Sequence, residues 1–231
     1  MGTCKNMLRL TMVGAAGLML GAASALASAT VIPVNNPSFE DAGSGVPSWT
    51  GTGGSGFGVY APNAPPTFNA IPDGTQVAYV YNTGARFWQQ TGEVLTAGRV
   101  YTLTAYLGER NDAYQPRTLI SILPSSQVAT LAIDPYTPVT LAFNQVEPAD
   151  VASGTFSQFS VVFDTNNPAN ASLMSQYAGE NLVIAFTAAA NGETDIDKVA
   201  FSYTVVPEPA ALSLLGLGAL GLVRRRRHGI N

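Results

Sequence analysis

The sequence lacks the side chains on which many catalytic and metal sites depend. Its 231 residues include one cysteine, Cys4, and one histidine, His228, and both stand close to the ends of the chain. If both ends are removed on export, the mature protein contains neither a thiol nor an imidazole. Ser-His-Asp and Cys-His nucleophiles, zinc sites built from His or Cys, and disulfide bonds are then excluded.

Charged residues are also scarce, at 11% of the chain, and they are distributed unevenly. Basic residues cluster at the two ends, at positions 5, 9 and 224–227, whereas every acidic residue except Glu208 lies within residues 30–206. This acidic central region argues against a nucleic-acid groove or an anionic-lipid surface, so we expect no nucleic-acid partner. Nucleotide chemistry has no support either, because no glycine-rich segment has the spacing of a phosphate cradle.

Residues 1–29 have the organisation of a secretory signal peptide. A short basic region precedes an apolar stretch at residues 10–20, and small residues occupy positions 27–29. This order predicts a cleavable signal helix with cleavage after Ala27 or Ala29. The alternative is an uncleaved N-terminal anchor.

The last segment, residues 206–231, combines three features in order. Pro207, Glu208 and Pro209 precede an apolar run at residues 210–223, and the basic cluster Arg224, Arg225, Arg226 and Arg227 follows it. As a helix at about 1.5 Å per residue, the run spans roughly 21 Å, which is short of the ~30 Å hydrocarbon core of a bilayer. We therefore expect a short apolar helix that inserts only transiently in the membrane, with the arginines on the cytoplasmic side.

These features resemble the PEP-CTERM sorting tail. In that family an exosortase recognises and cuts the tail, in Gram-negative bacteria that make extracellular polysaccharide. The resemblance implies an exosortase-type processing protease as a partner. It also implies a secreted protein, sorted to the cell envelope of a Gram-negative bacterium.

Residues 30–205 carry the pattern of an all-β domain. Apolar residues alternate along residues 100–107, which places Tyr101, Leu103, Ala105 and Leu107 on one face of a strand. Turn-forming residues separate the runs, as an antiparallel β-sandwich requires. One short helix is expected at residues 170–177 and a long loop at residues 43–58. Further strands are expected at residues 76–81, 85–90, 118–123, 127–133, 139–143, 156–163, 182–187 and 198–205.

Several segments of this domain resemble known jelly rolls. Residues 35–40, followed by Pro47, Ser48 and Trp49, resemble the opening of galactose-binding-like and carbohydrate-binding-module domains, and residues 195–199 resemble their last strand. Residues 71–79 and 101–110 resemble the Stig cyclases, which are cyanobacterial terpenoid-indole cyclases with the same fold. The resemblance implies a jelly-roll sandwich. Lys198 stands where the family pattern commonly has asparagine, which we interpret as a surface change.

The same resemblance implies a structural calcium ion. In the resembled sandwiches, a Glu and an Asp bind a calcium that ties the first strand to the last, and the matching positions here are Glu40 and Asp197. Carboxylates and main-chain carbonyls suit a hard cation of this kind. The alternative is that both are ordinary surface carboxylates at strand ends.

Aromatic rings with planar hydrogen-bond donors are the usual elements of sugar-binding sites. The candidates are Trp49, Trp88, Tyr106, Tyr114 and Arg110. Tyr106 lies opposite the Leu103 face of its strand, and Tyr114 lies in a polar loop. The alternatives are core packing for the tryptophans and a solvated charged loop around Arg110.

Catalysis in this domain would have to use Asp or Glu as the general acid or base. Acids in suitable contexts are Asp73, Glu109, Asp112, Asp134 and Asp164. In the Stig cyclases an aspartate supplies the acid, and the sequence alone does not assign that role to one of these positions. A sorting tail also fits poorly with a metabolic pathway enzyme, so we do not expect catalysis.

The leading hypothesis is an exported envelope or matrix protein that binds a glycan or exopolysaccharide and is stabilised by calcium. One alternative is a structural matrix protein that binds no small ligand. The other is a Stig-cyclase-like enzyme with an aspartate as its general acid.

Overall fold

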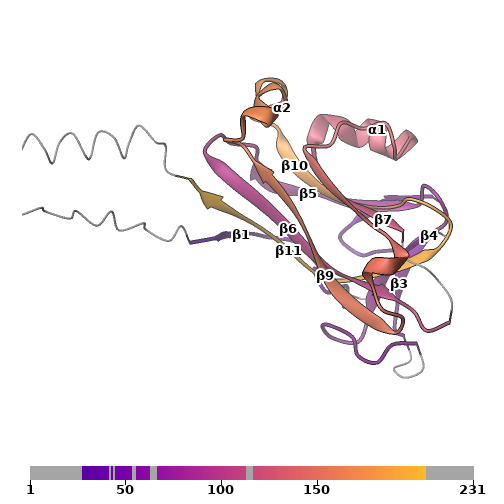
Figure 1. Cartoon of the computed structure of the whole chain (residues 1–231). Coiled ribbons are helices and arrows are strands. Elements are labelled where there is room, and N and C mark those ends of the chain that lie inside the picture. The colour runs from indigo at the N-terminus through magenta and orange to yellow at the C-terminus, as the bar shows by residue number, and fades with distance from the viewer. Residues whose placement is uncertain are drawn as a thin grey trace, which may run out of the picture.

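Alternating apolar side chains build two antiparallel sheets that pack face to face (Figure 1). The computed structural model describes residues 28–41, 43, 45–53, 56–62, 67–112 and 117–206. This architecture confirms the expected all-β sandwich of the jelly-roll class. The signal helix and the sorting helix, with Pro207–Pro209 and Arg224–Arg227, lie outside the described residues, as does Tyr114.

Sheet A has the strand order β3-β4-β11-β6-β9, and β1 pairs with β11 beside this path. Its three longest strands are β11 and β6, which lie side by side, and β9, which pairs with β6 at the edge. The strands are β1 (Thr30–Ile32), β3 (Phe57–Tyr60), β4 (Val77–Tyr81), β6 (Arg99–Glu109), β9 (Thr155–Asp164) and β11 (Glu193–Val205).

Sheet B has the order β2-β5-β10-β7-β8. Its strands are β2 (Thr50–Thr52), β5 (Arg86–Val94), β7 (Thr118–Pro124), β8 (Ala142–Val146) and β10 (Asn181–Ala188). Short helices lie in the connections: α1 (Val128–Ile133), α2 (Ala171–Tyr177) and the 3₁₀ turns η1 (Ser125–Gln127), η2 (Pro148–Asp150) and η3 (Pro168–Asn170).

The main hydrophobic core fills the space between the sheets. The four residues predicted to share the inner face of β6 are all completely buried there, which confirms the alternation read from the sequence. Sheet B contributes Phe87, Ile120, Ile122, Ile184 and Phe186 from the other side. A second, smaller core lies on the outer face of sheet B, where Leu131 of α1 covers Trp88, Leu123 and Val183.

Two predictions for single elements are wrong. Residues 127–133 form a helical segment, η1 continuing into α1, rather than a strand. A short apolar run is compatible with either structure, and here Val128, Leu131 and Ala132 meet the sheet at helical spacing. Residues 43–58 contain β2 and the start of β3 rather than one long loop. The short helix expected at residues 170–177 is confirmed by α2.

The helices of the described segments are all short. None of them has the length and apolar character that a membrane crossing requires.

A β-bulge in β11 changes which side chains face the core. The pairing of β11 with β6 shifts between Asp197 and Ala200. Ile196 points into the core before the bulge, and Val199 and Phe201 do so after it. The bulge contains Lys198, whose φ of +50° lies in the left-handed region. The Val199 amide then donates to the Pro37 carbonyl at 2.8 Å, so the bulge ties the N-terminal segment to the last strand.

Candidate functional site

Three acidic side chains of β11 share one face of sheet A. Thr194 and Ile196 alternate with them, and Ile196 belongs to the core between the sheets. Glu193, Asp195 and Asp197 therefore point to the outer face of the sheet. They are nevertheless buried, with exposed fractions of 9%, 0% and 0%. Because a buried carboxyl group is costly unless it is paired or uncharged, the surroundings of these groups are informative.

Asp195 lies in the most enclosed of these positions. The Tyr60 hydroxyl donates to its Oδ1 at 2.8 Å, and Tyr79 stands opposite it on β4. Its Oδ2 is buried and has no hydrogen-bond partner among the described residues. Burial, followed by the charge of Glu193, raises the pKa of Asp195 well above its ordinary value. Burial therefore favours the uncharged form of this carboxyl group.

Arg110 neutralises the acidic groups beside Asp195. Its Nη1 donates to Glu193 Oε1 at 2.6 Å, and its Nε and Nη2 donate to the two carboxylate oxygens of Asp112 at 2.9 and 2.6 Å. The guanidinium also lies over the Tyr60 ring, 5.6 Å from its centroid. These hydrogen bonds from Arg110 hold the pKa of Asp112 below its usual value. Arg110 is thus part of an ordered network rather than of a solvated loop.

Tyr106 borders a groove on the same outer face. It stands opposite Asp197 on the neighbouring strand, and the Lys198 ammonium lies 5.7 Å from its ring centroid. The groove has a volume of ≈ 270 Å³, and its other walls come from Phe156 and the segment 69–72. The sequence prediction therefore placed Tyr106 correctly on a face turned away from the core.

Trp49 and Trp88 are packing residues in this structure. Trp49 lies within 6 Å of the rings of Phe39, Phe87 and Phe186, between the two sheets. Trp88 lies under α1 on the outer face of sheet B. Their exposed fractions are 9% and 6%, so neither ring offers a free face to a ligand.

The predicted calcium ligands Glu40 and Asp197 meet at the turn of residues 73–76. Glu40 Oε1 accepts hydrogen bonds from the amides of Thr75 and Gln76, at 2.8 and 2.7 Å. Asp197 Oδ2 accepts one from the Asp73 amide at 2.8 Å. The N-terminal segment, this turn and β11 are thereby joined.

The carboxylates at this turn carry charges of the same sign and repel one another. Burial raises the pKa of Asp197 to about 6, and the negative charges of Asp73 and Glu40 act in the same direction. Burial also acts to raise the pKa of Glu40, but donation from the Gln76 and Thr75 amides outweighs it and the pKa is lowered. Within the described residues, no group of three or more His, Cys, Asp or Glu side chains is arranged to hold a metal ion. The carboxylates that a cation could meet at this turn are those of Glu40 and Asp197, and both accept hydrogen bonds from main-chain amides.

Sequence reasoning missed Asp195 and Glu193. The available signal was the alternation at residues 193–197, which puts three acids on one face of a strand whose other face is apolar. Two of the acids proposed instead have local roles, since Asp134 and Asp164 accept hydrogen bonds from amides two residues further on.

Comparison with protein-family models gives two matches. The HpiC1 cyclase model, described as HpiC1-like, matches residues 30–202. The PEP-CTERM protein-sorting motif matches residues 205–227, which confirms the resemblance of the tail and indicates an exported protein sorted to the cell envelope by an exosortase.

Solved structures of similar fold include two cyclase complexes from Fischerella sp. TAU. The Stig cyclase Fisc with (3Z)-3-(1-methyl-2-pyrrolidinylidene)-3H-indole has 22% identity and a TM-score of 0.61, over 78% of this chain and 100% of that one. A cyclase with 4-(1H-indol-3-yl)butan-2-one has 21% identity and a TM-score of 0.60 over the same shares, 78% and 100%.

The CBM22-1 xylan-binding domain of Paenibacillus barcinonensis Xyn10C is more distant. It has 13% identity and a TM-score of 0.45, over 74% of this chain and 93% of that one. No curated protein matches the chain.

Proposed function

The chain belongs to the HpiC1 cyclase family, and on that premise we propose that its exported domain binds a planar, ring-bearing substrate on the outer face of sheet A and protonates it from Asp195. One observation carries this proposal. The Asp195 carboxyl is completely buried, one oxygen is held by the Tyr60 hydroxyl, and the other has no hydrogen-bond partner among the described residues.

A carboxyl group acts as a general acid only while it keeps its proton. Burial favours the uncharged form of Asp195, because a charge is poorly solvated there. In an acid-catalysed cyclisation, the proton on Oδ2 adds to an unsaturated carbon of the substrate, and a nucleophilic carbon of the same molecule closes the ring onto the resulting cation. The ring-closed cation then loses a proton from carbon to the carboxylate, which gives the neutral product and restores the acid. Throughout this cycle the Tyr60 hydroxyl donates to Oδ1 and stabilises the carboxylate.

The aromatic side chains of this face favour a flat ligand. Tyr60 and Tyr79 pack edge to face with centroids 5.9 Å apart, and both are half-buried. Rings arranged in this way pack well against other unsaturated rings. Because a similar cyclase was solved with 4-(1H-indol-3-yl)butan-2-one, that compound is a suitable probe.

The test is deuterium exchange into the indole ring of this probe, measured by NMR in D₂O with the full-length chain. Proton donation by Asp195 should accelerate exchange above the buffer rate. Asp195→Asn should lower the rate about 100-fold, the scale of general acid catalysis, while Tyr60→Phe should lower it about tenfold, as expected for loss of a hydrogen bond to a charged group. Asp112→Asn is the matched control, since Asp112 is a neighbouring acid that is about half exposed.

Two outcomes would contradict proton donation. One is an exchange rate equal to that of buffer, and the other is an Asp195→Asn variant that is folded and as active as the unmodified chain.

Glycan binding without catalysis is the second candidate function. The observation that favours it is the groove beside Tyr106, which the half-buried rings of Tyr106 and Phe156 line on an exported protein. A pull-down on the producing organism's own polysaccharide should then saturate, and Tyr106→Ala should weaken it. Val162→Ala, an exposed position on the same face of sheet A, is the control. A structural matrix protein predicts no saturable binding.

We also propose that calcium stabilises the domain through Glu40 and Asp197. Their carboxylates lie at one turn, where burial and then the charges of Asp73 and Glu40 raise the pKa of Asp197, and a divalent cation would offset both effects. Calcium at about 100 times its Kd would add about 2.7 kcal/mol to the free energy of unfolding. A chelator should therefore lower Tm and calcium should restore it. Glu40→Gln and Asp197→Asn should each abolish this response of Tm to calcium, whereas Asp134→Asn should keep it. A Tm that does not change with calcium would refute the proposal.

We also propose how the C-terminal tail is processed. The apolar run at residues 210–223 would insert transiently in the membrane of a Gram-negative bacterium, with its arginines in the cytoplasm, until an exosortase-type protease removes it.

A further inference from the structure

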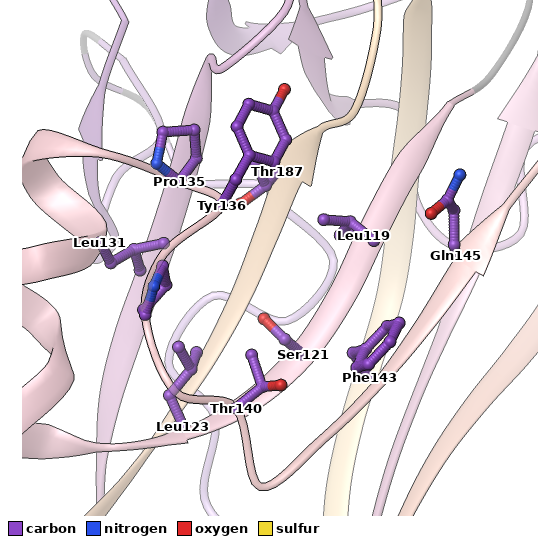
Figure 2. Close-up of a pocket in the computed structure, with 11 residues that line it drawn as sticks. Leu119, Ser121, Leu123, Leu131, Pro135, Tyr136, Thr140, Phe143, Gln145 and Thr187 are labelled. Carbon is purple, nitrogen blue, oxygen red and sulfur yellow. The ribbon is translucent and has the colours of Figure 1, made fainter.

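The outer face of sheet B carries a cleft that none of these functions uses. Its volume is ≈ 230 Å³, and it lies between the segment that joins α1 to β8 and the strands β7, β8 and β10 (Figure 2). Two cross-strand rows form its floor. One row consists of Gln145, Leu119 and Thr187, and part of the next row consists of Phe143 and Ser121.

None of the eleven residues that line the cleft is charged. Arg86 lies opposite Thr187 on the neighbouring strand β5, and its guanidinium hydrogen-bonds to groups outside the cleft lining. Its two terminal nitrogens donate to the carbonyls of Gly84 and Ala132, at 2.5 and 2.6 Å. The cleft therefore suits an uncharged ligand.

Two aromatic rings rise from the edges of this cleft, as Figure 2 shows for Tyr136 and Phe143. Their exposed fractions are 50% and 62%, which is high for rings of this size. The Tyr136 hydroxyl donates to the Ala188 carbonyl at 2.9 Å, so this ring is fixed in place. Both rings thus present apolar surface beside a concave site.

Hydroxyl groups lie between the rings on the floor. Ser121 and Thr187 are almost completely buried, with exposed fractions of 5% and 2%. Neither hydroxyl forms a hydrogen bond with another group in the described part of the chain. Both residues line the cleft, so a ligand with its own hydroxyl groups can hydrogen-bond to them there in place of water.

We propose that this cleft binds one neutral saccharide ring. The apolar C–H face of the sugar packs on Phe143 and Tyr136, and its hydroxyls bond to Ser121, Thr187 and Gln145. The volume is below the range of about 300–1,000 Å³ typical of sites for larger ligands, so the cleft takes a single ring. The export of this protein brings the site to the saccharides outside the cell.

The test uses the full-length chain and five neutral probes: D-glucose, D-galactose, D-mannose, D-xylose and L-rhamnose. Saturation-transfer NMR followed by titration should find saturable binding of at least one of them. Phe143→Ala should weaken that binding about tenfold. Ser121→Ala and Thr187→Val, which each remove one hydroxyl with little change in volume, should weaken it about threefold.

The controls separate this site from the others. Val162→Ala should bind normally because Val162 is exposed on the opposite sheet. Tyr106→Ala reports on the groove of sheet A: binding lost in that variant but kept in Phe143→Ala would belong to the second candidate function and not to this cleft. Thermal melting verifies that each variant is folded.

Three results would overturn the proposal. The first is the absence of saturable binding for all five sugars. The second is binding that survives Phe143→Ala and Thr187→Val together. The third is a dimer, detected by light scattering, that Phe143→Ala dissociates, since this would assign the face to a second copy of the chain.

Discussion

Arg110 holds two carboxylates in different environments, and this difference predicts two different energies. The side chain of Glu193 is 11% exposed, whereas that of Asp112 is 51% exposed. Arg110→Met would leave Glu193 as an uncompensated buried charge, at a cost of about 3 kcal/mol in the free energy of unfolding. The half-exposed pair with Asp112 should contribute at most about 1 kcal/mol, because water screens it.

Double-mutant cycles measure the two pairs separately. Urea denaturation of the full-length chain would be followed for Arg110→Met, Glu193→Gln, Asp112→Asn and the two double variants. We expect a coupling energy of about 2 kcal/mol for Arg110 with Glu193 and below about 1 kcal/mol for Arg110 with Asp112. Arg110→Met alone should lower Tm by about 6–12 °C, given about 2–4 °C per kcal/mol in a domain of this size.

Salt gives an independent check on these pairs. In 1 M NaCl the Debye length falls to about 3 Å, so the coupling to Asp112 should vanish while most of the coupling to Glu193 persists. If the cycle with Asp112 equals or exceeds the cycle with Glu193, the argument from burial is wrong. A cost below about 1 kcal/mol for Arg110→Met would contradict it equally.

Three further predictions concern the core, acid stability and processing. Trp49→Ala should lower the free energy of unfolding by about 3–5 kcal/mol in a denaturation experiment, because it opens a cavity among three phenylalanine rings; a cost below 1 kcal/mol would show that the ring is not packed as described. Because the pKa of Asp112 is lowered on folding, its contribution to stability is present above about pH 4 and is lost as the pH falls through the lowered value. Asp112→Asn should therefore show a smaller loss of Tm between pH 5 and pH 2.5, and an unchanged slope would refute the assignment. Mass spectrometry of the exported protein should find a mature species that begins near Ser28 or Thr30 and lacks Arg224–Arg227; intact termini on a cytoplasmic protein would contradict export.

The strands with regular alternation were predictable from local sequence, because burial on one face follows directly from a period of two. β2 and β3 were not, because their glycines carry no hydrophobic signal. Gly51 and Gly58 are required by neighbours: a Cβ would lie 2.2 Å from the Phe57 ring at Gly51 and 2.9 Å from the Tyr79 hydroxyl at Gly58. Strand formation here depends on packing that the local sequence does not contain.

The candidate site was less predictable than the fold. Asp195 owes its raised pKa to burial in the folded domain, and its hydrogen-bond partner Tyr60 is 135 residues away in the sequence, so no local pattern distinguishes it from the other acids. Lys198 shows the same limit. Its side chain is exposed, as expected of a surface change, but the residue also occupies a left-handed backbone position that glycine and asparagine adopt most readily.

The pairing of β1 with β11 determines how the domain can carry force. The two strands are antiparallel, with Thr30 opposite Tyr203 and Ile32 opposite Phe201, so the polypeptide enters and leaves at the same pole (Figure 1). A pull between these two points would peel the strands apart one residue pair at a time, which is the weakest way to load a sheet. A domain attached at one point only avoids this stress and keeps the flanks of both sheets open to its surroundings.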